Sequence, residues 1–157
     1  MVVPLDKIDH VILQALLLDG RASFSAIARE TKLTDVAIKK RFESLKKRGV
    51  IDSVSVGLNY KVLGYENPIF LQLRTDVSKN KDIIKKLQGM DFVIELYQVL
   101  GEYNLIAKLI VPNLDSAEKF ISQLGLIDGV IDLKTMVVLS DVKKSKTLPA
   151  TTFQNKI

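Results

Sequence analysis

The sequence contains no cysteine, no tryptophan and a single histidine, His10. Without cysteine there is no disulfide, no thiolate nucleophile and no cysteine-ligated zinc or iron–sulfur site. One histidine is too few for most metal-ligand sets, and it leaves the chain without the usual general base. A glycine-rich phosphate loop and a convincing pair of catalytic carboxylates are also missing. We therefore expect no cofactor and no enzymatic activity.

Long apolar runs are absent as well. No segment approaches the roughly 20 apolar residues that a membrane-spanning helix needs. The run VILQALLL follows Asp6 and Asp9 and has no small-residue cleavage pattern after it, so it does not resemble the core of a signal peptide. We expect a soluble, cytoplasmic protein without a membrane partner.

The overall composition is typical of a globular protein. Of the 157 residues, 47% are hydrophobic and 26% are charged, and the net charge is +5. Such a chain can fill the core of one ordinary domain or of two small ones. The positive charge suits an anionic partner without requiring one.

The first 58 residues show the pattern of three short helices followed by a strand. Each helix begins after a residue suited to the N-cap position: Asp6, Ser23 and Thr34. Gly20 and Gly49 end the first and the third helix, and residues 53–58 (SVSVGL) alternate as a strand. Two short helices joined by a tight turn make a helix-turn-helix, here with the extra strand of a winged domain.

The third helix has two unlike faces. At helical spacing, Ile38, Phe42 and Leu45 fall on one side. The opposite side carries Val36, Lys40, Glu43 and Lys47. One face can therefore be anchored while the other stays free.

Six basic residues lie between Lys39 and Arg48, with Glu43 as the one acid among them. A solvated helix face would explain such a run, and some three-helix domains bind protein instead. Lysine and arginine beside a duplex release condensed counterions, and a helix-turn-helix points the start of its second helix at the bases. We predict binding to double-stranded DNA through Arg21, Thr34, Asp35, Val36, Ala37, Lys39, Lys40, Arg41 and Lys47.

The second half follows the order βαββαβ of a ferredoxin-like domain. Strands are predicted at 68–75, 92–100, 103–111 and 130–139, and helices at 80–90 and 114–125, the latter with Leu114 turned inward. Both helices should cover one face of the sheet. The other face, with Phe70 and Tyr97, is half-apolar, which favours pairing with a second subunit.

These motifs together resemble the leucine-responsive regulator (Lrp/AsnC, feast/famine) family over nearly the whole chain. The first half carries LDKIDHVILQALLLDGR and, after the basic helix, GVI; the second half carries VLGEYNLIAKL and IDGVIDLKTMVVL. The resemblance implies an α+β protein with an N-terminal helix-turn-helix domain (1–58), a linker (59–66), a ferredoxin-like sensing and dimerisation domain (67–143) and a tail (144–157). The tail is either frayed or an added edge strand.

The resemblance also implies sheet-mediated homodimers, assembled further into tetramers or octamers, and an amino-acid effector held between dimers. By position, the effector site would contain Tyr97, Gly101, Glu102, Tyr103, Asn104, Thr135, Met136 and Val137. The sequence departs from the family turn at Glu102 and Asn104, where the family has aspartates. An ordinary strand turn remains the alternative for GEYN, and plain packing remains the alternative for Tyr97 and Met136.

The implied function is an effector-responsive transcriptional regulator. One alternative is a stand-alone small-molecule sensor or adaptor, which the basic face around Lys40 and Lys47 disfavours. The other is a decarboxylase of the same architecture, which would need a histidine in the sensing half, and residues 61–157 contain none.

Overall fold

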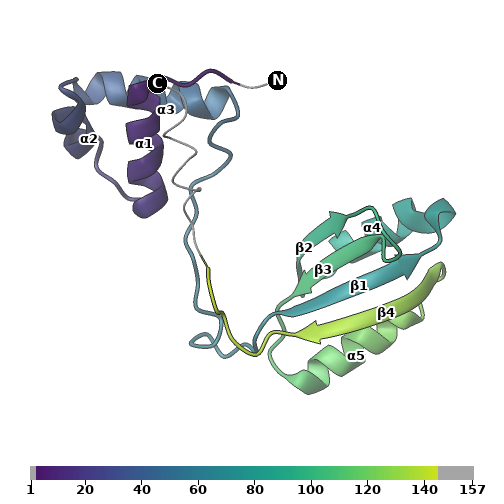
Figure 1. The fold of residues 1–157 in the computed structure, drawn as a ribbon. Helices are drawn as coiled ribbons and strands as arrows, with labels where there is room; N and C mark the ends of the chain where they lie inside the picture. The colour runs from purple at the N-terminus through teal and green to yellow at the C-terminus, as the bar shows by residue number, and fades with distance from the viewer. Residues whose placement is uncertain (1–2, 145–157) are drawn as a thin grey trace. The chain divides into compact units, whose positions relative to one another are not determined.

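The structure is a computed structural model that describes residues 3–144 (Figure 1). The chain divides into two compact units, one formed mainly by the residues up to Gly57 and the other by Leu58–Val142. The predicted tail, residues 144–157, lies outside the described residues except for Lys144. No helix within residues 3–144 is long and apolar enough to cross a bilayer.

Three helices form the first unit: α1 (Lys7–Leu18), α2 (Phe24–Thr31) and α3 (Asp35–Lys47). Their apolar faces meet in one core, whose buried members are Ile12, Ile27, Ala28, Ile38 and Leu45. Between α2 and α3 the chain turns through Lys32, which has a φ of 57°. A left-handed residue at this position ends α2 and redirects the chain sharply, and the predicted helix-turn-helix is confirmed.

Two of the three predicted side-chain caps are present. Asp6 accepts a hydrogen bond from the Asp9 N–H, and the Thr34 hydroxyl accepts one from the Ala37 N–H. Ser23 occupies the N-cap position of α2, but its side chain makes no capping hydrogen bond. Its backbone carbonyl accepts from the N–H groups of residues 26 and 27 instead, so the first turn of α2 is closed by the backbone.

The strand predicted at 53–58 is wrong. These residues adopt no regular secondary structure, and Val54 and Val56 are 52% and 85% exposed. A strand is stable when it pairs with neighbours and buries a face. Within residues 3–144 no strand pairs with this segment, so its alternating sequence does not form a wing in the single chain.

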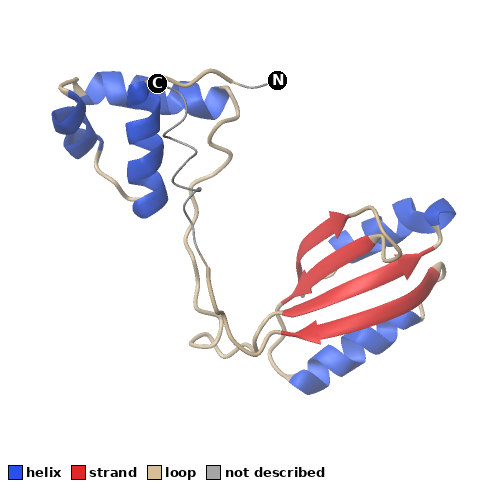
Figure 2. Cartoon of the chain, viewed as in Figure 1, coloured by secondary structure: helices blue, strands red, loops and turns tan. Residues whose placement is uncertain are grey.

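The second unit contains a four-stranded antiparallel sheet with the order β2-β3-β1-β4. In chain order its elements are β1 (Ile69–Thr75), the 3₁₀ turn η1 (Val77–Lys79), α4 (Asn80–Gln88), β2 (Val93–Gln98), β3 (Leu105–Leu109), α5 (Leu114–Gly125) and β4 (Val130–Val137). Both helices lie on one face of the sheet (Figure 2), and the predicted ferredoxin-like arrangement is confirmed.

Burial alternates along β1 and distinguishes the face of the sheet covered by helices from the uncovered face. Its odd-numbered residues, Ile69, Leu71 and Leu73, are buried against α4 and α5, while Phe70, Gln72 and Arg74 face the uncovered side. Leu114 departs from the prediction: it is 56% exposed because it is the first residue of α5, before the helix reaches the core.

Gly129 brings the turn before β4 close to α4. Its φ is 93°, and its carbonyl accepts a hydrogen bond of 2.8 Å from the Asp76 N–H. A Cβ at this position would lie 2.9 Å from Lys79 Cβ and 3.1 Å from Ile83 Cδ1. The turn therefore needs glycine for both its conformation and its packing.

We predict that Gly129→Ala lowers the free energy of unfolding by about 1–3 kcal/mol, measured by urea denaturation. Gly64→Ala is the matched control, because Gly64 also has a positive φ, 84°, but a Cβ there would meet nothing within 4 Å. The free energy of unfolding of Gly64→Ala should fall by less than that of Gly129→Ala. Equal losses in the two variants would show that Lys79 and Ile83 move aside without cost.

Candidate nucleic-acid interface and effector site

One face of α3 anchors it to its own unit. Ile38 and Leu45 on this face are 0% exposed, and the Phe42 ring packs against Phe24 with centroids 5.2 Å apart. Burying two such aliphatic side chains contributes roughly 3–6 kcal/mol. The helix cannot rotate about its axis without exposing them.

The opposite face of α3 is exposed along its length. It carries Val36, Lys40, Glu43 and Lys47, which we call the outward stripe, and Val36 is 68% exposed. Within residues 3–144, Lys39, Lys40 and Lys47 form no ion pair. Three ammonium groups are thus available to an anionic partner.

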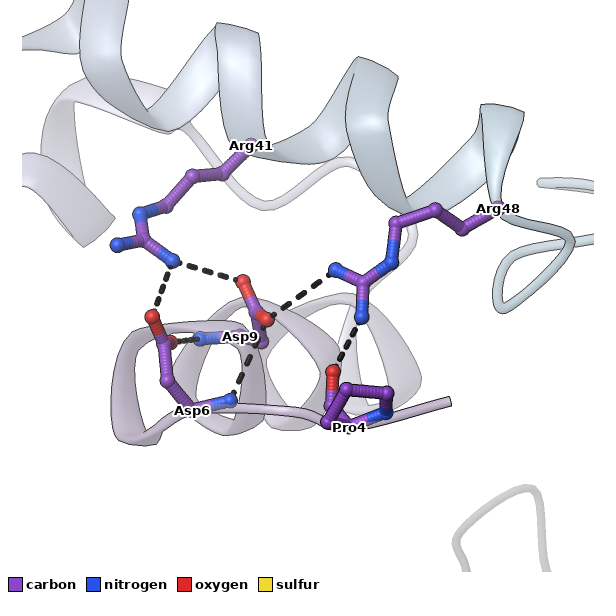
Figure 3. A network of polar contacts seen from close by, with 5 residues as sticks. All are labelled: Pro4, Asp6, Asp9, Arg41 and Arg48. Atoms are coloured by element: carbon purple, nitrogen blue, oxygen red, sulfur yellow. Dashed lines mark hydrogen bonds and ion pairs between the residues drawn. The ribbon is translucent and has the colours of Figure 1, made fainter. Parts of the chain in front are cut away.

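Arg41 and Arg48 point to α1 instead (Figure 3). Arg41 Nη1 lies 2.6 Å from Asp6 Oδ2 and 3.0 Å from Asp9 Oδ1. Arg48 Nη1 lies 3.6 Å from Asp9 Oδ2, and its Nη2 donates to the Pro4 carbonyl. The Asp9 side chain is only 7% exposed, so the two guanidinium groups stabilise its charge in place of water.

The same carboxylates close the first turn of α1 as a capping box. Burial acts to raise the pKa of Asp6, but the Asp9 N–H and the Arg41 guanidinium outweigh it, and the pKa lies below its ordinary value. The hydrogen bond to Asp6 in turn raises the pKa of Arg41. Arg41, predicted to contact DNA, is engaged within the protein.

Sequence reasoning missed Arg48 and the two aspartates of this network. The signal was present, since Arg41 and Arg48 are seven residues apart and therefore lie on one face of a helix. Asp9 follows Asp6 by three residues, which is the spacing of a capping box.

The other predicted DNA contacts lie at the start of α3 or near α1. Thr34 caps the helix, Ala37 is half-buried and the Asp35 carboxylate accepts a hydrogen bond from the Ser25 hydroxyl. The Arg21 side chain is 94% exposed, with Nε 3.8 Å from Asp19 Oδ1. A contact this exposed contributes little to stability, so Arg21 can exchange it for another anion.

The turn around Gly101 joins β2 to β3. The Val99 N–H donates to the Asn104 carbonyl at 3.0 Å. Gly101 has a φ of 158°, and the nearest atom to a Cβ built there is the Tyr103 carbonyl oxygen at 3.7 Å. A Cβ at Gly101 would therefore make an ordinary van der Waals contact and no clash. Glu102 is exposed, and its Oε1 lies 3.7 Å from Arg74 Nη1.

Asn104 is occupied within the fold. Its Oδ1 accepts from the Thr75 N–H at 2.9 Å and from the Thr75 hydroxyl at 3.0 Å. Its Nδ2 donates to the Thr75 carbonyl and to Asn80 Oδ1. Thr75 and Asn80 are 5% and 7% exposed, and buried polar groups of this kind need their partners. Asn104 thus joins the turn to the end of β1 and the start of α4.

Tyr103 belongs to a polar cluster on the uncovered face that sequence reasoning missed. Its hydroxyl donates to Asp132 Oδ2 at 2.5 Å, and Lys134 Nζ lies 4.3 Å from its ring centroid. The Tyr103 hydrogen bond is the main reason that the pKa of Asp132 lies below its ordinary value. Arg74 on β1 lies opposite Asp132 on β4 in the strand register. The sequence alone does not reveal that these two residues are neighbours.

The single chain does not gather the predicted effector residues. Tyr97 lies on β2 and Met136 on β4, the two outer strands of the sheet. Met136 pairs with Phe70 on the uncovered face, whereas Thr135 and Val137 pair with Leu71 and Ile69 on the helix side. Residues from both edges can meet at one ligand only if two copies of the chain come together.

Two family models match the chain. Residues 5–46 match the AsnC-type helix-turn-helix domain, and residues 69–148 match the Lrp/AsnC ligand binding domain. The chain belongs to the Lrp/AsnC family.

Named Lrp/AsnC relatives cover almost the whole chain. The HTH-type transcriptional regulator FL11 of Pyrococcus horikoshii is 30% identical over 149 residues, spanning 95% of this chain and 99% of that protein. The HTH-type transcriptional regulator Ptr1 of Methanocaldococcus jannaschii is 32% identical over 146 residues, spanning 92% and 99%. These relatives are transcriptional regulators, not enzymes, and the chain is a helix-turn-helix transcriptional regulator of the same family.

Solved Lrp/AsnC structures share the fold. E. coli AsnC superimposes with a TM-score of 0.83 at 24% identity, covering 92% of this chain and all of that one. The feast or famine regulatory protein of M. tuberculosis, solved in complex with L-methionine, gives a TM-score of 0.83 at 24% identity and covers 92% and 99%.

We predict that Asp9→Asn destabilises the helix-turn-helix unit by about 1–3 kcal/mol, because a buried charged acceptor is lost and two guanidinium groups lose a partner. Urea denaturation followed by the helical signal measures the effect. Asp52→Asn, the same change at an exposed position, should alter stability by less than about 0.5 kcal/mol. A loss in Asp9→Asn no greater than in this control would contradict the proposed role of the network.

Proposed function

We propose that this regulator recognises its operator by placing α3 in the major groove of double-stranded DNA. The observation that supports this most is the sorting of charge on α3. Both arginines are paired inside the protein, while Lys39, Lys40 and Lys47 are exposed and unpaired within the described residues. Phosphate oxygens are the partners that such a lysine-rich face suits.

The position of each residue along α3 suggests its role. Lys40 lies in the first half of the helix, where helix-turn-helix proteins approach base edges, and Lys47 lies in the last turn, where the backbone passes. Arg21 adds a phosphate contact from outside α3. In this proposal residues 1–58 bind DNA in the cytoplasm, 59–66 link the parts and 67–143 sense an effector.

We predict that Lys40→Ala changes the sequence enriched from random DNA, with a loss of about 1–3 kcal/mol at one base pair. Lys47→Ala should weaken all sequences alike and reduce the salt slope of binding by about one per subunit. Selection from random duplexes and binding isotherms at several salt concentrations measure both effects.

Lys81→Ala removes the same charge from an exposed position on α4 and serves as the control. It should leave the enriched sequence unchanged. If it impaired binding as much as Lys40→Ala does, net charge rather than α3 would account for the affinity, and the proposal would fail.

We also propose that an amino acid or a similar small molecule binds between copies of the chain, in a dimer or larger homo-oligomer. The charges near the turn are of both signs, Glu102 and Asp132 beside Arg74 and Lys134, which suits a zwitterion. The separation of Tyr97 from Thr135 at the two sheet edges supports a site completed by a second copy. The methionine complex of the M. tuberculosis relative supports this ligand class.

We predict that the full chain scatters light as a dimer or larger species and that one of the common amino acids raises its melting temperature. A ligand at a hundred times its dissociation constant adds about 2.7 kcal/mol. Tyr97→Ala and Thr135→Ala should each abolish the shift. Mixed oligomers of the two variants should recover about a quarter of the sites, because a site formed from the intact edges of two different copies is complete. No recovery on mixing would contradict a shared site.

A further inference from the structure

Val36 is an apolar side chain that lies outside the core of its own unit. It is 68% exposed, although the core of the unit lies on the opposite face of the same helix. Valine is also a poorer helix former than alanine or lysine, because its branched side chain loses rotamer freedom. Neither packing nor helix stability accounts for a valine at this position.

The neighbours of Val36 leave it as the first free side chain of the outward stripe. The Thr34 hydroxyl is taken by the Ala37 N–H, and the Asp35 carboxylate by the Ser25 hydroxyl. Lys40 follows one turn later on the same face. A helix docked with its N-terminal end toward the base pairs would thus present an apolar group first and a cation next.

One chemical group in the major groove suits contact with an exposed aliphatic side chain. Base edges there offer hydrogen-bond donors and acceptors, except for the C5-methyl group of thymine, which is apolar. A valine that displaces water from that methyl gains by burial, whereas against the donors and acceptors of the other base edges it would cover a polar atom without a hydrogen bond.

We propose that Val36 is a specificity-determining residue that contacts the C5-methyl group of one thymine in each operator half-site. The inference rests on the proposed binding of DNA through α3. It identifies one base of the operator by its chemistry.

The test removes the methyl group from the DNA and the valine from the protein. The sequence enriched by the full wild-type chain is synthesised with 2′-deoxyuridine in place of each thymine in turn, which deletes the methyl group and keeps every hydrogen bond of the base pair. At one thymine per half-site, wild-type affinity should fall about fourfold, the effect of burying one methyl group. At the other thymines it should stay within about twofold.

Val36→Ala should lose affinity for the thymine operator and become insensitive to uracil at that one position, so that the two changes are not additive. Alanine favours the helix, so folding is preserved. Val62→Ala, the same change at a position that is 80% exposed in the second unit, should keep the wild-type sensitivity.

The outcomes separate this inference from the function on which it rests. If wild-type chain enriches no sequence, both are overturned. If it enriches a sequence but Val36→Ala responds to every uracil as the wild type does, DNA recognition stands and the contact of Val36 with thymine is overturned. An enriched sequence without thymine in its half-sites would likewise overturn the contact of Val36 and leave DNA recognition standing.

Discussion

The carboxylate of Asp9 is the group on which the geometry of the DNA-binding unit depends. Its two oxygens are shared between two arginines: Oδ1 lies beside Arg41 of α3 and Oδ2 beside Arg48, the C-cap residue of α3. The arginines are two turns apart, so holding both restricts the tilt of α3 as well as its rotation. The apolar contacts of Ile38 and Leu45 are stronger in sum but carry no direction, whereas the charge-assisted hydrogen bond from Arg41 to Asp9 does.

This arrangement also explains how a helix can carry six basic residues in the free protein. Two of the six charges, on Arg41 and Arg48, are matched by the carboxylates of α1, so repulsion along the helix is reduced. The planar guanidinium group suits fixed carboxylates, while the ammonium group of lysine is compact, strongly hydrated and mobile. Arginine paired within the unit and lysine unpaired on the other face is the division that a helix needs when one face is structural and the other meets an anion.

Patterns that are local in the sequence predicted the structure well. The helix at 114–125 has the predicted bounds, Asp6 and Thr34 cap their helices, and the alternation of β1 indicates the correct buried face. Features that depend on a distant partner were missed. Residues 53–58 have the alternation of a strand but no partner strand in the described chain. The charge of Arg41 is visible in the sequence and suggests a DNA contact, whereas its partner Asp9 lies 32 residues away. The cluster of Arg74, Asp132 and Tyr103 becomes visible only through the strand register.

An asparagine at position 104 has a structural consequence. An amide can both accept from the Thr75 N–H and donate to Asn80, whereas an ionised carboxylate can only accept. Because Thr75 and Asn80 are buried, releasing Asn104 toward a ligand would leave polar groups without partners. The end of the turn is therefore fixed to β1 and α4, while Gly101 and Glu102 at its tip stay exposed. A ligand that displaced the tip would pull on β1 directly through the hydrogen bond from the Asn104 N–H to the Leu73 carbonyl. The displacement would then act on β1, one of the two central strands of the sheet.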